Sequence, residues 1–180
     1  MYPGKNLGAY GDAGIISTNN KKLYLIMRKL RNLGSEIKFK HELVGMNSRL
    51  DTLQAVILNH KLNKLSKLNL KRKKIADDYD KKINNKKILK LTYSKNSVYH
   101  QYVILVKKRN ELIKYLKKSN IQYGFHYPYA IHELQVFKGY FKDEKFPNSE
   151  MLSKYGISIP IDPNLTKKQI SYVINKLNSF

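Results

Sequence analysis

The sequence predicts a protein of the α/β class, and two patterns along the chain carry this prediction. After residue 85, short runs of β-branched and aromatic residues alternate with runs whose apolar residues recur at helical spacing. Before that point, residues 48–82 have the pattern of one long helix. The chain has 180 residues, of which 42% are hydrophobic and 27% charged, so it can bury a core. We expect a layer of helices packed on a layer of strands.

The first elements follow a glycine-rich N-terminal segment. Residues 14–18 (Gly-Ile-Ile-Ser-Thr) favour a short buried strand. A helix is predicted over residues 21–33, because its apolar residues recur three and four positions apart, and Gly34 is a suitable C-terminal stop. Residues 35–44 are predicted to be a polar connection.

The helix at residues 48–82 is the longest predicted element. Ser48 with Asp51 three residues later resembles a capping box, although a weaker one than Ser-x-x-Glu. A helix of about 30 residues spans roughly 45 Å, which is longer than one small domain needs. We therefore expect this helix to link two bodies, with Asn69 as a candidate break.

Strands and helices alternate in the rest of the chain. The predicted strands are 88–93, 98–106, 121–127 and 157–159. The predicted helices are 110–118, 148–155 and 167–178. Thr166 can cap the last helix. The core face of that helix is formed by Ile170, Val173, Ile174 and Leu177.

Composition excludes several classes of site. There is no cysteine, so neither a disulfide framework nor a thiolate metal site is possible. The histidines have no spacing that suggests a metal site. No apolar run approaches the roughly 18 residues of a membrane helix, and no signal-peptide pattern is present. We expect a soluble, cytoplasmic protein without a membrane partner.

The formal net charge of +22 is compatible with a nucleic-acid partner, but another explanation accounts for it. The lysines are scattered along every predicted helix and mixed with many asparagines, isoleucines and tyrosines, as A/T-rich codons would produce. We therefore expect no specific nucleic-acid partner. A ligand that carries a diphosphate would also be attracted by this charge.

One lysine, Lys5, lies in a segment crowded with helix-breaking residues. Four glycines and a proline occur within residues 1–14. Proline fixes its own φ and glycine adopts backbone shapes that other residues avoid, so such a segment can hold a side chain in a defined place on a sharply bent backbone. On the residues alone, a solvated lysine in a glycine-rich loop is the favoured interpretation.

The N-terminal segment and three later segments resemble the DegT/DnrJ/StrS family of pyridoxal-phosphate sugar aminotransferases. Pro3-Gly4-Lys5-Asn6-Leu7-Gly8 followed by Gly11-Asp12-Ala13-Gly14 is similar to the lysine segment of that family. The similarity continues through Asn32-Leu33-Gly34, Gly45-Met46-Asn47-Ser48-Arg49-Leu50-Asp51, His126-Tyr127-Pro128 and Ile159-Pro160-Ile161. Order and spacing agree from end to end of the chain.

This resemblance implies the C-terminal part of the aspartate-aminotransferase-like fold. Residues 1–47 would be the tail of the large cofactor-binding domain, residues 48–82 the linking helix, and residues 83–180 the small α/β domain. The family's intact members are about twice as long, and the absent half would precede Lys5. We expect apolar surface to be exposed around Ile15, Ile16 and Ile26 for this reason.

The resemblance also implies pyridoxal 5′-phosphate as the cofactor, with Lys5 as its covalent Schiff-base partner and as the group that later carries a proton. The amine must be neutral to attack the cofactor aldehyde, so an intact site has to bury it. The cofactor acts as the electron sink, while the protein supplies placement and electrostatics.

Four other residues are candidates for binding, three of them by the same resemblance. Asn47 corresponds to a phosphate ligand that reaches the neighbouring subunit's cofactor, and a loop asparagine without ligand is the alternative. His126 and Tyr127 correspond to a pair that faces the sugar pocket. Tyr2, three residues before Lys5, is a further candidate for lining the same site. A histidine at the end of a strand is equally often a structural residue, and Tyr2 has the same two interpretations.

The implied reaction is transfer of an amino group, with glutamate as the donor, onto a keto-sugar nucleotide for the biosynthesis of amino sugars and surface polysaccharides. A homodimer is expected of the intact family. The absent half would carry the turn that binds the cofactor phosphate, the stacked aromatic ring and the aspartate beside the pyridine nitrogen. We therefore expect this chain to be inactive alone. A non-catalytic remnant or a small basic interaction module is the alternative.

Overall fold

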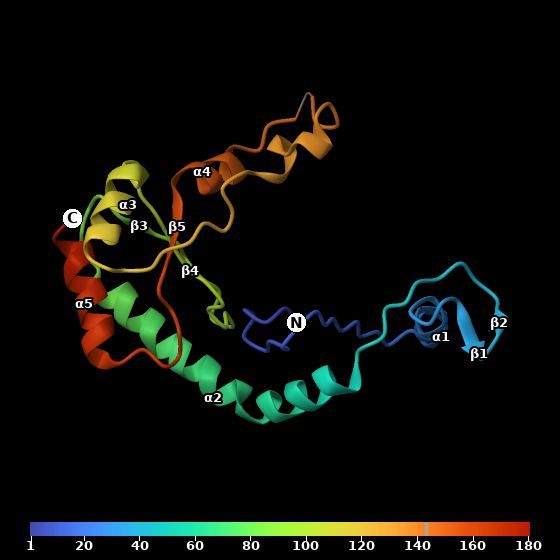
Figure 1. Ribbon diagram of the computed structural model, residues 1–180. Coiled ribbons are helices and arrows are strands. Elements are labelled where there is room, and N and C mark those ends of the chain that lie inside the picture. Colours follow the sequence, from blue (N-terminus) through green and yellow to red (C-terminus); the bar gives the residue numbers. More distant parts are fainter. Residues whose placement is uncertain (143) are drawn as a thin grey trace. The chain divides into compact units, whose positions relative to one another are not determined.

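The chain divides into two units, which are described separately. The computed structural model describes residues 1–142 and 144–180 (Figure 1). Unit 1 comprises Met1–Ser66 and unit 2 comprises Lys67–Phe180. Helix α2 (Thr52–Lys82) contributes its first turns to unit 1 and the remainder to unit 2.

Helix α1 (Lys21–Leu30) is the first regular element of unit 1. The Asn20 side chain caps it by accepting a hydrogen bond from the Leu23 N–H at 3.2 Å. The helix was predicted to continue through residue 33, but it ends three residues earlier. Leu33 and Gly34 adopt φ values of +60° and +75°, which are incompatible with a right-handed helix.

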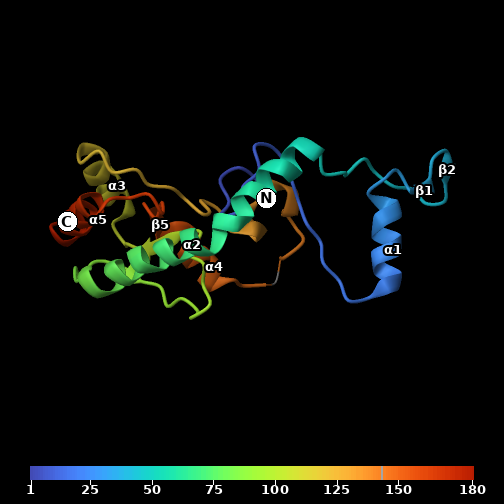
Figure 2. The ribbon, with the colours of Figure 1, turned by 90° about the horizontal axis from the view of Figure 1, so that it is seen from below.

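A small hairpin follows α1 where the sequence predicted an irregular polar connection. Strands β1 (Ser35–Ile37) and β2 (Lys40–His41) pair antiparallel, and they lie beside the C-terminal end of α1 (Figures 1 and 2). Gly34 is required just before β1, since a Cβ there would lie 1.6 Å from the Leu43 carbonyl oxygen.

The strand predicted at residues 14–18 is not formed, and this prediction was wrong. The segment is irregular and exposed in the structure. A strand is stable only when a neighbour pairs with its backbone, and within residues 1–142 and 144–180 no segment does so. As expected, apolar side chains are left uncovered here: Ile15 and Ile16 are each 77% exposed, and Ile26 is 46% exposed.

Helix α2 begins later than predicted and has no break. Its first helical hydrogen bond joins the Ala55 N–H to the Asp51 carbonyl oxygen at 3.0 Å, so Ser48 does not cap it. The helix is continuous from Thr52 to Lys82 through Asn69, the candidate break.

Unit 2 contains a three-stranded antiparallel sheet in the order β3-β4-β5. Its strands are β3 (Leu89–Lys90), β4 (Tyr102–Leu105) and β5 (Gly156–Ile159). The helices of this unit are α3 (Arg109–Lys118), α4 (Pro147–Tyr155) and α5 (Lys167–Asn178), with 3-10 turns η1 (Ile131–Glu133) and η2 (Gln135–Phe137).

The core of unit 2 lies between one face of the sheet and three helices. Tyr102 pairs with Ile159, and Ile104 with Ile157, so these four side chains share a face. They pack on buried side chains of the C-terminal half of α2, α3 and α5, namely Ile75, Tyr79, Leu112, Leu116, Ile174 and Leu177. Helices packed on strands are the layered arrangement that the sequence predicted (Figure 1).

Strands β3 and β4 are shorter than predicted, β5 begins one residue earlier than predicted, and the prediction of a strand at residues 121–127 was wrong. Residues 121–127 form no strand, and a single bridge joins Gly124 to Ser158 of β5. Pairing cannot extend beyond the end of β5, because Pro160 follows and has no N–H to donate. At β4, Tyr99 has a φ of +45°, so the strand begins only at Tyr102.

Helix α5 agrees with its prediction at both ends. Thr166 and Gln169 form a capping box, in which the Thr166 hydroxyl accepts from the Gln169 N–H at 3.2 Å. All four predicted core residues, Ile170, Val173, Ile174 and Leu177, are buried.

Candidate functional site

Lys5 lies in a loop that folds back on itself. Its backbone N–H donates to the Tyr2 carbonyl oxygen, and the Ala9 N–H donates to the Met1 carbonyl oxygen, each at 2.9 Å. Ala9 is buried, as is Gly8. The lysine is therefore presented on a bend whose base is packed and whose backbone is hydrogen-bonded.

Lys5 and Tyr2 differ from the packed base of this loop in being open to solvent. Lys5 is exposed, and Tyr2 is 64% exposed. An exposed primary amine is accessible to an aldehyde and can form a carbon–nitrogen bond with it, so this residue fits the aldehyde end of pyridoxal phosphate. The burial expected of an intact site is absent from the described structure.

We call residues 1–11, which carry Lys5, the lysine loop. Helix α2 contacts this loop through two side chains that the sequence did not single out. Gln54 Oε1 accepts a hydrogen bond from the Tyr10 N–H at 2.8 Å. The Lys61 ammonium donates to the Gly8 carbonyl oxygen at 2.7 Å. These two positions are seven residues apart, so they lie on one face of the helix. That spacing was visible in the sequence, but the contact of these two side chains with the loop was not.

Asn47 lies in the connection that precedes α2. Its Oδ1 atom accepts from Arg49 Nε at 3.0 Å, and the same guanidinium donates to Asn32 Oδ1 at 3.3 Å. Asn47 also forms an isolated β-bridge with Asn32. The helix N-terminus predicted beside Asn47 is several residues further along, since α2 begins at Thr52. Asn47 is thus oriented by Arg49 and not by a helix end, and its role toward phosphate stays a prediction.

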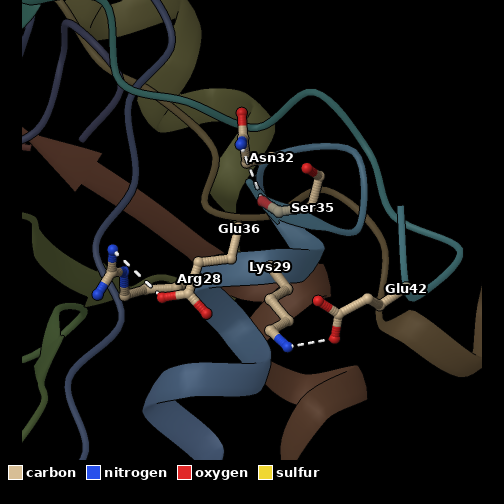
Figure 3. A network of polar contacts seen from close by, with 6 residues as sticks. All are labelled: Arg28, Lys29, Asn32, Ser35, Glu36 and Glu42. Atoms are coloured by element: carbon tan, nitrogen blue, oxygen red, sulfur yellow. Dashed lines mark hydrogen bonds and ion pairs between the residues drawn. The ribbon is translucent and has the colours of Figure 1, made fainter. Parts of the chain in front are cut away.

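Polar contacts hold the end of α1 and the hairpin together ahead of Asn47 (Figure 3). The contacts are Asn32 Nδ2 to the Ser35 carbonyl oxygen at 2.9 Å, Lys29 Nζ to Glu42 at 2.5 Å, and Arg28 to Glu36 at 3.9 Å. The hydrogen bond that the Lys29 ammonium donates to the Glu42 carboxylate raises the pKa of Lys29 above its ordinary value. The segment that leads to Asn47 is therefore tied to α1.

His126 and Tyr127 belong to unit 2, and the structure orients the histidine through both ring nitrogens. Nδ1 lies 2.8 Å from the Ser158 hydroxyl, and Nε2 lies 3.3 Å from Gln101 Nε2. The Tyr127 ring is 67% exposed and meets the His126 ring edge-on, with centroids 5.5 Å apart. These contacts are compatible with both interpretations of His126, as a structural residue and as a sugar ligand.

A cavity of about 470 Å³ lies elsewhere in unit 2. It is lined by side chains of β3, β4, α4 and the C-terminus, including Leu89, Leu105, Met151, Tyr155 and Phe180. None of the predicted site residues lines it. Across the described residues, no group of three or more potential ligands is arranged to hold a metal ion. None of the helices described is long and apolar enough to cross a membrane.

Comparison with known proteins identifies what this chain is similar to. A model of the DegT/DnrJ/EryC1/StrS aminotransferase family matches residues 1–178. The whole chain is 39% identical to a dTDP-3-amino-3,6-dideoxy-alpha-D-galactopyranose transaminase of Aneurinibacillus thermoaerophilus and covers 54% of that protein. The chain spans about half the length of the curated relatives it matches.

Solved structures lead to the same family. DesV of S. venezuelae, in complex with a ketimine intermediate, matches 99% of this chain at 33% identity with a TM-score of 0.94, over 49% of its own length. NtdA of Bacillus subtilis, with bound cofactor PMP, matches 97% of this chain at 25% identity with a TM-score of 0.81, over 43% of its own length. The fold is that of the C-terminal half of such aminotransferases. Both the family and the fold expected from the sequence are thereby confirmed, and the chain belongs to the DegT/DnrJ/EryC1/StrS aminotransferase family.

Proposed function

We propose that this chain supplies the lysine-bearing part of a pyridoxal-phosphate-dependent transaminase that acts on a keto-sugar nucleotide. The observation that carries the proposal is Lys5 itself, an accessible amine on a hydrogen-bonded bend within a segment matched by the aminotransferase family. The names of the relatives support a nucleotide-linked sugar as the substrate class. The net charge of +22 would also attract a diphosphate.

Each candidate residue has a distinct task in this proposal. The Lys5 amine would hold the cofactor by condensing with its aldehyde, whose oxygen leaves as water, and as a free base Lys5 would carry a proton at the reacting carbon. When bound, pyridoxal phosphate supplies the electron sink that makes this proton mobile. Asn47 offers amide N–H donors to the phosphate without needing to ionise. Tyr2, His126 and Tyr127 offer hydroxyl, imidazole and aromatic contacts to the sugar.

The exposure of Lys5 leads us to propose that the 180-residue chain does not catalyse transamination alone. Removal from water favours the neutral form of a lysine amine, and the described residues leave Lys5 exposed. Additional polypeptide that covers Lys5 would complete the site. We propose glutamate as the amino donor and a homodimer as the working assembly, in which Asn47 would serve the neighbouring subunit.

Borohydride trapping tests whether Lys5 is the cofactor lysine. The chain is incubated with pyridoxal phosphate, reduced and digested, and the modified lysines are mapped by mass spectrometry. We expect Lys5 to be labelled in clear preference to the other lysines, and the Lys5→Arg variant to lose that preference. Lys64→Arg is the matched control on an exposed lysine of α2, and it should leave the Lys5 label unchanged.

Diffuse labelling of many lysines would reject the cofactor role and favour a small basic interaction module. The net charge and the exposed apolar side chains of unit 1 are the observations that support an interaction module as the second candidate function. An electrophoretic binding assay with random-sequence DNA at increasing salt concentrations would measure how much of the chain's binding is due to non-specific charge attraction.

A further inference from the structure

One face of α2 holds the lysine loop at two places. Gln54 and Lys61 point from this face to the backbone on either side of the buried Ala9, and Leu58, 6% exposed, lies between them on the helix. The loop and this part of α2 all belong to unit 1. Two side chains seven residues apart on the helix therefore bind the loop backbone at Gly8 and at Tyr10, on both sides of Ala9.

Lys61 makes two contacts with its ammonium group. It donates to the Gly8 carbonyl oxygen at 2.7 Å, and it lies 4.5 Å from the centroid of the Tyr10 ring. A charged donor forms a stronger hydrogen bond than a neutral one, and a cation over a tyrosine face adds attraction. The same ammonium thus fixes the loop at Gly8 and at Tyr10.

Gln54 binds the loop backbone at Tyr10, two residues after Gly8. Its Oε1 atom accepts the Tyr10 N–H at 2.8 Å, and its Nε2 atom lies 3.2 Å from the position that a Cβ on Gly11 would occupy. The absence of a side chain at Gly11 therefore gives this amide room. Between them, Gln54 and Lys61 fix the backbone from Gly8 to Tyr10, which directly follows the bend that carries Lys5.

We propose that Lys61, assisted by Gln54, is a positioning residue for Lys5. This inference rests on the proposed function, in which Lys5 bonds to pyridoxal phosphate. The chain is rich in lysine, but not every lysine of α2 has this role. Lys64, one turn further on, places its ammonium 3.0 Å from the His60 ring on the same helix. Lys61 thus contacts the loop, whereas the contact of Lys64 stays within its own helix.

The test compares Lys61→Met, Lys61→Arg, Gln54→Leu and the control Lys64→Met in the full 180-residue chain. The first readout is hydrogen exchange of the peptide that covers residues 1–11, measured without cofactor. The second is the share of borohydride-trapped pyridoxal phosphate on Lys5 relative to the other lysines. Far-UV circular dichroism confirms that each variant keeps its helices.

We expect Lys61→Met and Gln54→Leu to speed exchange at residues 8–10 about fivefold, as loss of one hydrogen bond predicts. Lys61→Met should also lower the preference for Lys5 by a similar factor. Lys61→Arg should restore both values, because arginine can donate to a carbonyl and stack on tyrosine. Lys64→Met should behave as the unaltered chain.

The two hypotheses fail in different ways. Unchanged exchange at residues 8–10 together with unchanged Lys5 preference in Lys61→Met would overturn the positioning role. Diffuse labelling of the unaltered chain would instead reject the cofactor role of Lys5. In that case the exchange measurement alone would still decide whether Lys61 fixes the loop.

Discussion

At Gly8 the lysine loop closely approaches its own backbone. A Cβ at this position would lie 2.2 Å from the Pro3 carbonyl oxygen and 3.1 Å from that of Lys5. Both neighbours are backbone atoms, so they cannot move aside as a flexible side chain would. The glycine here is needed for close packing of the backbone, and the carbonyl of the same residue receives the Lys61 ammonium.

Gly8→Ala should therefore open the loop. Overpacking of this kind costs about 1–3 kcal/mol, which is enough to release a short loop while unit 2 stays folded. We expect faster hydrogen exchange over residues 1–11 and unchanged exchange in unit 2. Gly4→Ala is the matched control, because the nearest atom to its added Cβ is a Tyr2 ring carbon at 4.0 Å. Equal exchange in both variants would argue against a close-packed loop.

At the scale of single elements, α5 shows how local chemistry defines a helix. The Thr166 hydroxyl accepts from the Gln169 N–H, and Gln169 Oε1 in turn accepts from the Thr166 N–H at 2.9 Å. The helix then buries one apolar face on the core of unit 2. Its start is thus determined by four consecutive residues, and its orientation by the periodicity that follows.

Thr166→Ala should destabilise unit 2 by about 1 kcal/mol through loss of this cap. The decrease is measured from the urea midpoint of unfolding, followed by circular dichroism. Thr166→Ser keeps the hydroxyl and should retain most of the stability. If alanine and serine at this position gave the same midpoint, the capping box would contribute nothing measurable.

Unit 2 as a whole is built around buried tyrosines. Burial raises the pKa of Tyr79, Tyr93, Tyr99 and Tyr102 above the ordinary value of 10.0. Tyr79 donates its hydroxyl hydrogen to the Pro160 carbonyl oxygen at 2.7 Å, and Tyr102 donates to Asp80 at 2.5 Å. The rings of Tyr79 and Tyr102 meet edge-on with centroids 5.1 Å apart. The phenols therefore hold their protons more tightly in the folded state.

Stability of unit 2 should consequently fall as the pH rises above about 10. The unfolded chain releases tyrosine protons there while the folded chain keeps them, so the contribution is complete below pH 10 and is lost at higher pH. Tyr79 alone should contribute a slope of about 1.4 kcal/mol per pH unit. Urea titrations between pH 8 and 11 measure it.

Tyr79→Phe is the decisive variant for this slope, because it removes the ionisable group and keeps the ring. It should reduce the steepness of the decline above pH 10 by about 1.4 kcal/mol per pH unit, and the other buried tyrosines should account for the rest. Tyr140→Phe, at a side chain that is 75% exposed, should leave the decline unchanged. A decline of the same steepness in both variants would show that other groups, and not the buried phenol, govern alkaline unfolding.

How much of the fold the sequence predicted depends on how local each element is. The capping box and apolar face of α5 lie within its own residues, and that helix was predicted at both ends. The strand at residues 14–18 was predicted from its composition alone, and it fails because a strand needs a partner. The strand at residues 121–127 was likewise reduced to a single bridge at Gly124. Ser48 was a plausible cap by pattern, but α2 begins after Asp51.

By itself, the sequence determined the family, the lysine segment around Lys5 and the helices with local caps and periodicity. Each of these depends on residues that are close together in the sequence. Only the tertiary structure decided that Lys61 reaches Gly8 across 53 positions of the chain, that Arg49 and not a helix end orients Asn47, and that Lys5 is exposed. Contacts between distant residues depend on how the backbone bends between them, and that bending is set by packing rather than by any short pattern.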